Sequence, residues 1–315
     1  MQWWRVVGAI GRFMMRAGVL VLLFVAYQLW GTGLATNRAQ DRLEDEFATQ
    51  LAEQVTTTTE VPTSSTVAPP VTAPADLPTP EPGDPVARIQ IPAIGVDYIV
   101  LQGVDLTWLK EGPGHFPQTP LPGQPGNVAL AGHRTTYAAP FNRIDELQPG
   151  DDIVFETVQG TFTYEVEAHE GAPGEAPSGH FIVRPSQVEI LDQDGTDKVT
   201  LMACNPKYSA RERIVVTATL VSNPAPPTPL PEVEAGGGVT IDASVDALAG
   251  GDSSALWPAL FWTGLALGVW FLTWLAARRW PIWHKVPVYL VGTPIFFVVL
   301  FIAYENIARM LPAAY

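Results

Sequence analysis

Residues 198–220 read KVTLMACNPKYSARERIVVTATL, two apolar segments separated by a short polar loop. In the second segment Ile214, Val216, Ala218 and Leu220 are apolar and would share one face of a strand, which places Arg213 on the opposite face. The first segment ends at Cys204. If the two strands pair as a hairpin, Cys204 and Arg213 lie together at its open end.

Cys204 is the only cysteine among the 315 residues, so no internal disulfide holds the fold. A single cysteine is either a buried, inert residue or a reactive thiol. A reactive thiol needs a nearby cation to lower its pKa from about 8.5, and a guanidinium can supply this charge and also hold an oxyanion. A surface arginine beside a buried cysteine is the alternative, and the spacing alone leaves both readings open.

A cysteine nucleophile also needs an acid or base, normally a histidine. His133 follows the apolar run Val128–Ala131 directly, and a residue that leaves a buried strand for a polar loop is well placed for a site. His115, in the sequence GPGH, is the other candidate. The sequence context favours His133 without excluding His115. Of the remaining three histidines, His169 and His180 flank a Gly/Pro-rich stretch, and His284 lies in a short basic loop.

Strand-like patterns dominate the middle of the chain. Residues 161–168 alternate between apolar and polar side chains, and a turn at 158–160 would join them to the apolar segment 152–157. Many short strands with Gly and Pro turns between them predict a mainly β barrel or sandwich. A short helix is expected at Phe141–Leu147. The further strand candidates are Ala87–Ile91, Val128–Ala131, Val188–Leu191, Lys198–Cys204 and Arg213–Leu220.

Three uncharged apolar segments, 17–35, 256–277 and 286–304, are long enough to cross a membrane as helices. Arginines precede the first segment and acidic residues follow it, while the loop 278–285 between the other two is basic. The positive-inside rule therefore places the N-terminus in the cytoplasm and the middle domain outside. A cleaved signal peptide is the alternative for the first segment, but the run is long and no clean small-x-small site follows it.

Two segments of biased composition delimit the middle domain. Residues 55–85 are rich in Thr, Pro and Ala and cannot bury enough apolar surface to fold. Pro-rich and Gly-rich parts mark a second linker after residue 221. The predicted organisation is a cytoplasmic N-terminus (1–16), a membrane helix (17–35), an extracellular linker (36–85), the catalytic domain (86–221), a linker (222–255), a membrane helix (256–277), a cytoplasmic loop (278–285), a membrane helix (286–304) and an extracellular tail (305–315).

The formal net charge of the whole chain is −14. Binding to nucleic acid needs clustered Lys and Arg that neutralise phosphates, so this balance excludes nucleic acid as the expected partner. The charge otherwise indicates only that the exposed part of the protein is soluble.

Two long motifs, in this order, resemble the sortase family. They are GPGHFPQTPLPGQPGNVALAGHRTTYAAPFNRIDEL at residues 112–147 and VTLMACNPKYSARERIVV at residues 199–216. The GHRTTY and CNPKYSARER parts are similar to class E sortases of high-GC Gram-positive bacteria. The resemblance covers about residues 86–221. It implies a closed β-barrel of about eight strands, here flanked by one N-terminal and two C-terminal transmembrane helices.

The resemblance also implies roles for individual residues. Cys204 matches the nucleophile, His133 the acid/base, and Arg213, the second arginine of the ARxR motif, the residue that clamps the oxyanion and the substrate. Tyr137 matches a tyrosine associated with substrate choice in class E. His115 matches a structural position of the family.

Two features of the sequence bear on substrate and metal binding. Sortases usually have TLxTC before the nucleophile, and Ala203 replaces the threonine, so a hydroxyl next to the substrate is missing at this substrate-binding position. The acidic segment Leu191–Asp197 has carboxylates at alternating positions, as calcium loops do, but it is short and lacks a terminal Glu. We interpret it as a solvated turn and expect neither a metal nor another cofactor.

The expected activity is that of a multi-pass enzyme of the cytoplasmic membrane with an extracellular catalytic domain. It would cleave an LAxTG- or LPxTG-like sorting signal of a surface protein between Thr and Gly, through a thioacyl intermediate, and transfer the protein to an amine of a peptidoglycan precursor. A thiol endopeptidase that uses water, or an inert wall-binding scaffold, is the alternative. A pilin polymerase usually has an inhibitory Asp-Pro-aromatic motif, and residues 83–86 lack the aromatic residue.

Overall fold

The computed structural model describes residues 3–57, 77–170, 176–229, 253–279 and 282–310, which divide between two compact units. One unit begins at Gly33, ends before Gly250 and contains all nine strands. The other contains the apolar helices α1, α5 and α6. Their bounds are Trp3–Ala26 for α1, Leu256–Arg279 for α5 and Ile282–Met310 for α6.

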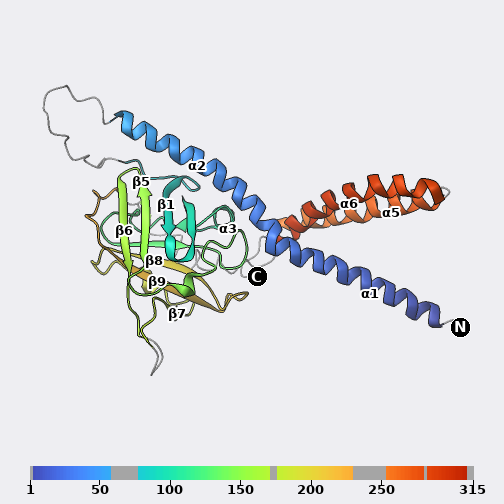
Figure 1. The fold of residues 1–315 in the computed structure, drawn as a ribbon, viewed down its shortest axis with the longest axis horizontal. Helices are drawn as coiled ribbons and strands as arrows, with labels where there is room; N and C mark the ends of the chain where they lie inside the picture. The colour runs from blue at the N-terminus through green and yellow to red at the C-terminus, as the bar shows by residue number, and fades with distance from the viewer. Residues whose placement is uncertain (1–2, 58–76, 171–175, 230–252, 280–281, 311–315) are drawn as a thin grey trace. The chain divides into compact units, whose positions relative to one another are not determined.

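Eight strands close into a barrel in the order β6-β5-β1-β2-β3-β4-β8-β9, because β9 also pairs with β6 (Figure 1). The ninth strand, β7, is added to β9 beside β6. The fold is therefore the closed barrel of about eight strands that the sequence predicts. The strands are β1 Pro85–Ile91, β2 Val96–Gln102, β3 Gly114–His115, β4 Asn127–Ala131, β5 Asp152–Thr157, β6 Gly160–Val166, β7 Phe181–Val183, β8 Lys198–Asn205 and β9 Glu212–Leu220.

Alternation along the strands separates an inner core from a second cluster outside the barrel wall. Leu201 of β8 and Val216 of β9 pack in the inner core with Phe155 and Tyr164. Their neighbours Met202 and Val215 face the other way, and also become buried, in an outer cluster. Both faces of β8 and β9 are thus covered, which explains their nearly continuous apolar sequence. The outer cluster consists of Val104, Leu109, Phe116, Ala129, Ala131, Val183, Leu191, Met202 and Val215.

Most predicted strands are present. One predicted strand and one predicted helix differ from the structure, and three strands were not predicted. Val188–Leu191, predicted as a strand, forms the 3₁₀ helix η4, which caps the outer cluster with Leu191 instead of pairing. The predicted helix Phe141–Leu147 is reduced to the 3₁₀ helix η3, Ile144–Glu146, while Phe141, Ile144 and Leu147 remain buried. The strands β2, β3 and β7 were not predicted, since two of them have only two or three residues.

The first part of the predicted linker 36–85 is helical. A π-helical turn, Tyr27–Gly31, connects α1 to α2, which covers Thr32–Thr57. Leu43 and Phe47 lie four residues apart on one face of α2 and are buried against Ile99 and Leu101 of β2. This apolar pair packs α2 on the barrel. The pair is hard to recognise in the sequence because charged residues surround it. Residues 58–76 of the predicted linker lie outside the described residues.

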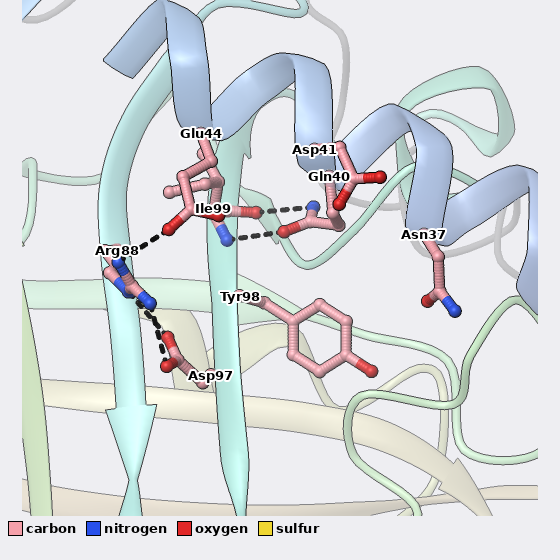
Figure 2. A pocket seen from close by; sticks show the side chains of 8 residues that line it. All are labelled: Asn37, Gln40, Asp41, Glu44, Arg88, Asp97, Tyr98 and Ile99. Carbon is pink, nitrogen blue, oxygen red and sulfur yellow. Dashed lines mark hydrogen bonds and ion pairs between the residues drawn. The ribbon is translucent and has the colours of Figure 1, made fainter. Parts of the chain in front are cut away.

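A glutamine side chain fastens α2 to the backbone of β2. The side chain of Gln40 donates from Nε2 to the Ile99 carbonyl at 3.1 Å, and its Oε1 accepts from the Ile99 N–H at 2.7 Å (Figure 2). Nε2 also donates to the Glu111 carbonyl at 2.8 Å. The amide group thus satisfies backbone groups of β2 much as a neighbouring strand would. Beside it, Arg88 forms exposed ion pairs with Asp97 and Glu44.

The second predicted linker, 222–255, also begins on the barrel surface. The N–H of Ala225 donates to the Gly123 carbonyl at 2.8 Å, and the N–H of Thr228 donates to Oε1 of Gln124 at 3.1 Å. Ala225 is buried in the inner core cluster. Residues up to 229 are therefore held by the barrel although they form neither helix nor strand.

Among the described residues, three helical runs are long and apolar enough to cross a membrane, one beginning in α1 and the others lying in α5 and α6. The helices extend past the predicted segments, since α1 begins at Trp3 and α6 continues to Met310. Large apolar side chains such as Trp257 and Leu290 are exposed, which suits lipid rather than water. Within this unit the Tyr304 hydroxyl donates to the Leu20 carbonyl at 2.7 Å and so links α6 to α1.

Replacing Phe47 by alanine tests whether α2 belongs to the folded domain. Truncation of this buried ring should cost about 3 kcal/mol of unfolding free energy and lower the melting temperature of the full chain in detergent by about 5–10 °C. The matched control is Glu46→Ala, because Glu46 is exposed on the same helix. Equal melting temperatures for both variants would show that α2 does not stabilise the barrel.

Candidate active site

Strand register brings Cys204 and Arg213 together. β8 and β9 are antiparallel, and Cys204 pairs directly with Arg213 at the end of the ladder. Residues that lie opposite each other on antiparallel strands have side chains on the same face. The hairpin predicted from the sequence is thus confirmed and does bring the two residues together, but they lie one pair from the connecting loop 206–211 and not at its open end.

The same ladder places His133 beside them. β4 runs parallel to β8, with Ala131 opposite Met202, and the N–H of Gly132 continues the pairing by donating to the Met202 carbonyl at 3.0 Å. His133 and Cys204 are each two residues beyond this matched pair. Two parallel strands therefore deliver a histidine and a cysteine at one level of the barrel rim.

Burial sets the ionisation of His133. Its side chain is buried, and beside it Phe141 packs on Gly132, where a Cβ atom would collide with the ring. Burial, and secondarily the ammonium of Lys110, lowers the pKa of His133 to about 4. At neutral pH the imidazole is therefore neutral. Its Nε2 is buried and has no hydrogen-bond partner among the described residues.

The Cys204 thiol is also neutral at rest. Burial raises the pKa of this thiol, and the positive charges of Arg213 and Arg134 oppose that effect. Two guanidinium groups thus act on the thiolate in the direction expected for a nucleophile, although burial prevails before any substrate binds.

Arg213 is buried but only partly hydrogen bonded. Its Nη1 donates to the Ala210 carbonyl at 2.9 Å and to the Glu212 carbonyl at 3.0 Å, which holds the guanidinium in place. Its Nε and Nη2 are buried without a partner in the part of the chain that the structure describes. Unpaired buried donors are costly, so these two point to an acceptor supplied by a ligand.

Arg134 is a site residue that the sequence analysis missed. Its Nη1 donates to the Cys204 carbonyl at 3.2 Å and to Oδ1 of Asn205 at 2.6 Å, and its Nη2 lies 3.1 Å from the Asp145 carboxylate. The side chain is 5% exposed. Arg134 therefore ties the segment after β4 to the end of β8. Its place directly after His133 was the available signal.

The other predicted site residues are divided between two places. The ring of Tyr137 lies against that of His133, with 5.0 Å between their centres. Ala203, by contrast, packs in the inner core opposite Ile214. The structure therefore brings Tyr137 to the site and does not bring Ala203 to the face that Cys204 and Arg213 share.

His115 and the acidic segment both have structural contacts. His115 is fully buried, and its ring nitrogens bond to Gln102 at 2.7 Å and to the Pro120 carbonyl at 2.8 Å. In the acidic segment, Asp194 pairs with Lys198 and Asp197 accepts from the Gly126 N–H. These carboxylates point to different partners rather than to a common centre.

A small hollow next to Arg213 is lined by apolar side chains. Val183 of β7, Ile190 and Leu191 of η4, and Met202 of β8 form its walls together with Arg213. It adjoins the outer cluster and lies on the face of β8 and β9 that carries Cys204. The hollow is closed, with no room for a water molecule, and Arg184 and Gln187 also line it.

At the rim of this closed barrel, Cys204 on β8 lies between the segment that carries His133 and the strand that carries Arg213. Residues 89–221 match the family described as the sortase domain. The chain therefore belongs to the sortase family.

Named relatives agree with class E. Sortase SrtE1 of Streptomyces coelicolor is 29% identical over 220 residues, and the match covers 68% of this chain and 56% of that relative. Sortase SrtE2 of the same organism is 28% identical over 237 residues, covering 68% of this chain and 82% of the relative. A solved structure of sortase E from Streptomyces avermitilis is 32% identical and covers 45% of this chain and 91% of its own, with a TM-score of 0.38.

The charge of Arg134 can be tested with an Arg134→Gln variant. Loss of a cation near the thiol destabilises the thiolate, so the pKa of Cys204 should rise and alkylation by iodoacetamide at pH 8 should slow. The pH dependence of the alkylation rate, measured on the full chain, gives the midpoint directly. Arg143→Gln is the matched control, because Arg143 is exposed and pairs only with Glu146 and the Ile94 carbonyl. An unchanged midpoint would show that Arg134 does not act on the thiol.

Proposed function

We propose that this sortase cleaves an LAxTG- or LPxTG-like sorting signal between Thr and Gly and transfers the surface protein to an amine of a cell-wall precursor. Cys204 is the nucleophile, His133 the acid and base, and Arg213 the residue that holds the oxyanion. The pairing of Cys204 with Arg213, whose Nε and Nη2 lack partners, supports this proposal most directly.

The first half of the reaction forms a thioester. His133, neutral at physiological pH, accepts the thiol proton of Cys204, and the sulfur attacks the carbonyl carbon of the signal's Thr. The resulting oxyanion accepts hydrogen bonds from Arg213. The C–N bond to Gly then breaks, and the imidazolium of His133 gives its proton to the leaving amine.

The second half transfers the acyl group. An amine of the precursor attacks the thioester carbon, and His133 takes the proton that this amine loses. A new amide bond forms as the C–S bond breaks, and Cys204 leaves as a thiolate that recovers the proton from His133. The low pKa of the buried imidazole favours the return of each proton over its uptake.

Tyr137, which packs on His133, is suited to contact residues of the sorting signal near the cleavage point. Ala203 contributes to substrate choice only through the barrel wall, because its side chain faces the core. The substrate thus lies across the rim, with its scissile carbonyl at Cys204.

The proposed topology follows the charges around the apolar segments. By the positive-inside rule, Arg5, Arg12 and Arg16 favour a cytoplasmic N-terminus, and Arg278 and Arg279 favour the same side for the connection between α5 and α6. The barrel then lies outside the cytoplasmic membrane, where both surface proteins and wall precursors are found.

A peptide assay tests the activity. The full chain in detergent should cleave an LAxTG peptide after Thr and, with a small amine present, form a new amide to it, as detected by mass spectrometry. Both products should be absent with Cys204→Ala. Cleavage with transfer only to water would instead indicate an endopeptidase. No reaction with LAxTG or LPxTG peptides and no adduct on Cys204 would contradict the proposal and favour a scaffold.

The clamp can be tested by exchanging arginine for lysine. Arg213→Lys keeps the charge but removes the planar pair of N–H donors, so kcat/KM for the peptide should fall by about 10²–10³-fold, as for loss of an oxyanion donor. Arg211→Lys is the matched control on the exposed neighbour. Equal values of kcat/KM for the two variants would remove Arg213 from the mechanism.

A further inference from the structure

The segment that carries Tyr137 has an unfavourable backbone. Tyr137, Ala138 and Ala139 have φ values of 53°, 58° and 47°, so three consecutive residues with side chains adopt the left-handed conformation. Residues other than Gly rarely do this even singly, and such a backbone persists only where its surroundings determine it. The contacts around this left-handed turn, residues 137–139, therefore show what holds Tyr137 in place.

Contacts from outside the turn come from β2 and α2. The Tyr98 hydroxyl donates to the Ala138 carbonyl at 3.4 Å. On α2, Gly33 faces the turn, since a Cβ atom there would be in ordinary van der Waals contact with Cα of Ala138, at 3.7 Å. The first turn of α2 thus lies next to the middle of the left-handed turn.

A second route runs from α2 through Lys110. Thr36 of α2 is fully buried, and its hydroxyl donates to the Lys110 carbonyl at 2.8 Å. The ammonium of Lys110 lies 5.8 Å from the centre of the Tyr137 ring, a cation–π arrangement. Tyr137 in turn packs on His133. Thr36 is therefore connected to the imidazole through two side chains.

The contacts near Gly33 and Thr36 depend on how firmly the next turns of α2 are held. Gln40, one turn further on, makes two hydrogen bonds to the backbone of Ile99 (Figure 2) and a third to the Glu111 carbonyl. Leu43 and Phe47 follow with their buried side chains. This anchor fixes the position of the N-terminal turns of α2 along the barrel.

We propose that α2 is a positioning element of the active site, which holds the left-handed turn and Lys110 so that Tyr137 stays packed on His133. The proposal rests on the proposed function, because it assigns α2 a role in that reaction. A domain cut at residue 86 would lack the helix and would retain the barrel with a loosened turn. The charged and titratable groups around the imidazole are Lys110 after α3, Tyr137 in the turn, Arg134 in the adjoining segment, Cys204 on β8 and Arg213 on β9.

The test uses Thr36→Val and Gln40→Ala in the full chain, with Thr49→Val as the matched control. Thr49 is exposed on the same helix and its hydroxyl bonds only within it, to the Asp45 carbonyl. Both test variants should lower kcat/KM for the sorting peptide by about tenfold or more, within the range for misplaced catalytic groups. They should also shift the acidic limb of the pH profile of kcat/KM to higher pH. Burial and Lys110 both lower the pKa of His133, and a loosened turn weakens both effects.

Amide hydrogen exchange over residues 133–140 provides a readout that does not need activity. Exchange should be faster in Thr36→Val and Gln40→Ala than in the wild type and in Thr49→Val. If the wild type fails to process any peptide while exchange responds in this way, the proposed reaction fails and the positioning role of α2 stands. The proposal is wrong if the test variants speed up exchange within α2 but leave three quantities equal to those of Thr49→Val. These are the exchange rates of residues 133–140, kcat/KM for the peptide, and the pH of the acidic limb.

Discussion

The register of three neighbouring strands is the constraint on which the site depends. β4 is parallel to β8, and β8 is antiparallel to β9. His133, Cys204 and Arg213, from three separate parts of the sequence, therefore lie at one rim of the barrel. A shift of one residue in either pairing would turn Cys204 or Arg213 to the opposite face. Core packing prevents that shift, because Leu201, Ile214 and Val216 fill the inside of the barrel only in this register. Barrel stability and catalytic geometry therefore have the same physical origin.

Much of this arrangement could be predicted from the sequence. Alternation in residues 214–220 assigned Arg213 to the non-core face, and the apolar run before His133 marked the end of a strand. The motifs that carry the family resemblance then joined these residues to Cys204. What local patterns could not supply was contact between distant segments. Arg134 bridges to Cys204 and Asp145 only after folding, and short strands such as β3 and β7 take their shape from their partners.

The segment after the first apolar stretch shows a different limit. Residues 36–57 fell within the predicted linker 36–85, whereas Thr36, Leu43 and Phe47 of this segment are buried. Two apolar residues four positions apart are weak evidence for a helix, and they became decisive only against the surface of β2. Ala203 was misjudged for a related reason: position next to the nucleophile in the sequence suggested contact with substrate, whereas strand alternation turns the side chain inward.

The pairing of Arg213 links substrate binding in the proposed reaction to the stability of the protein. Its Nε and Nη2 are buried without a partner among the described residues, and a buried donor that finds no acceptor costs about 1–3 kcal/mol. In the proposed reaction, a sorting signal or a thioacyl group that accepts these hydrogen bonds would remove that cost. Substrate would then also protect the folded chain against heat and proteases, so its supply would influence how long a molecule survives.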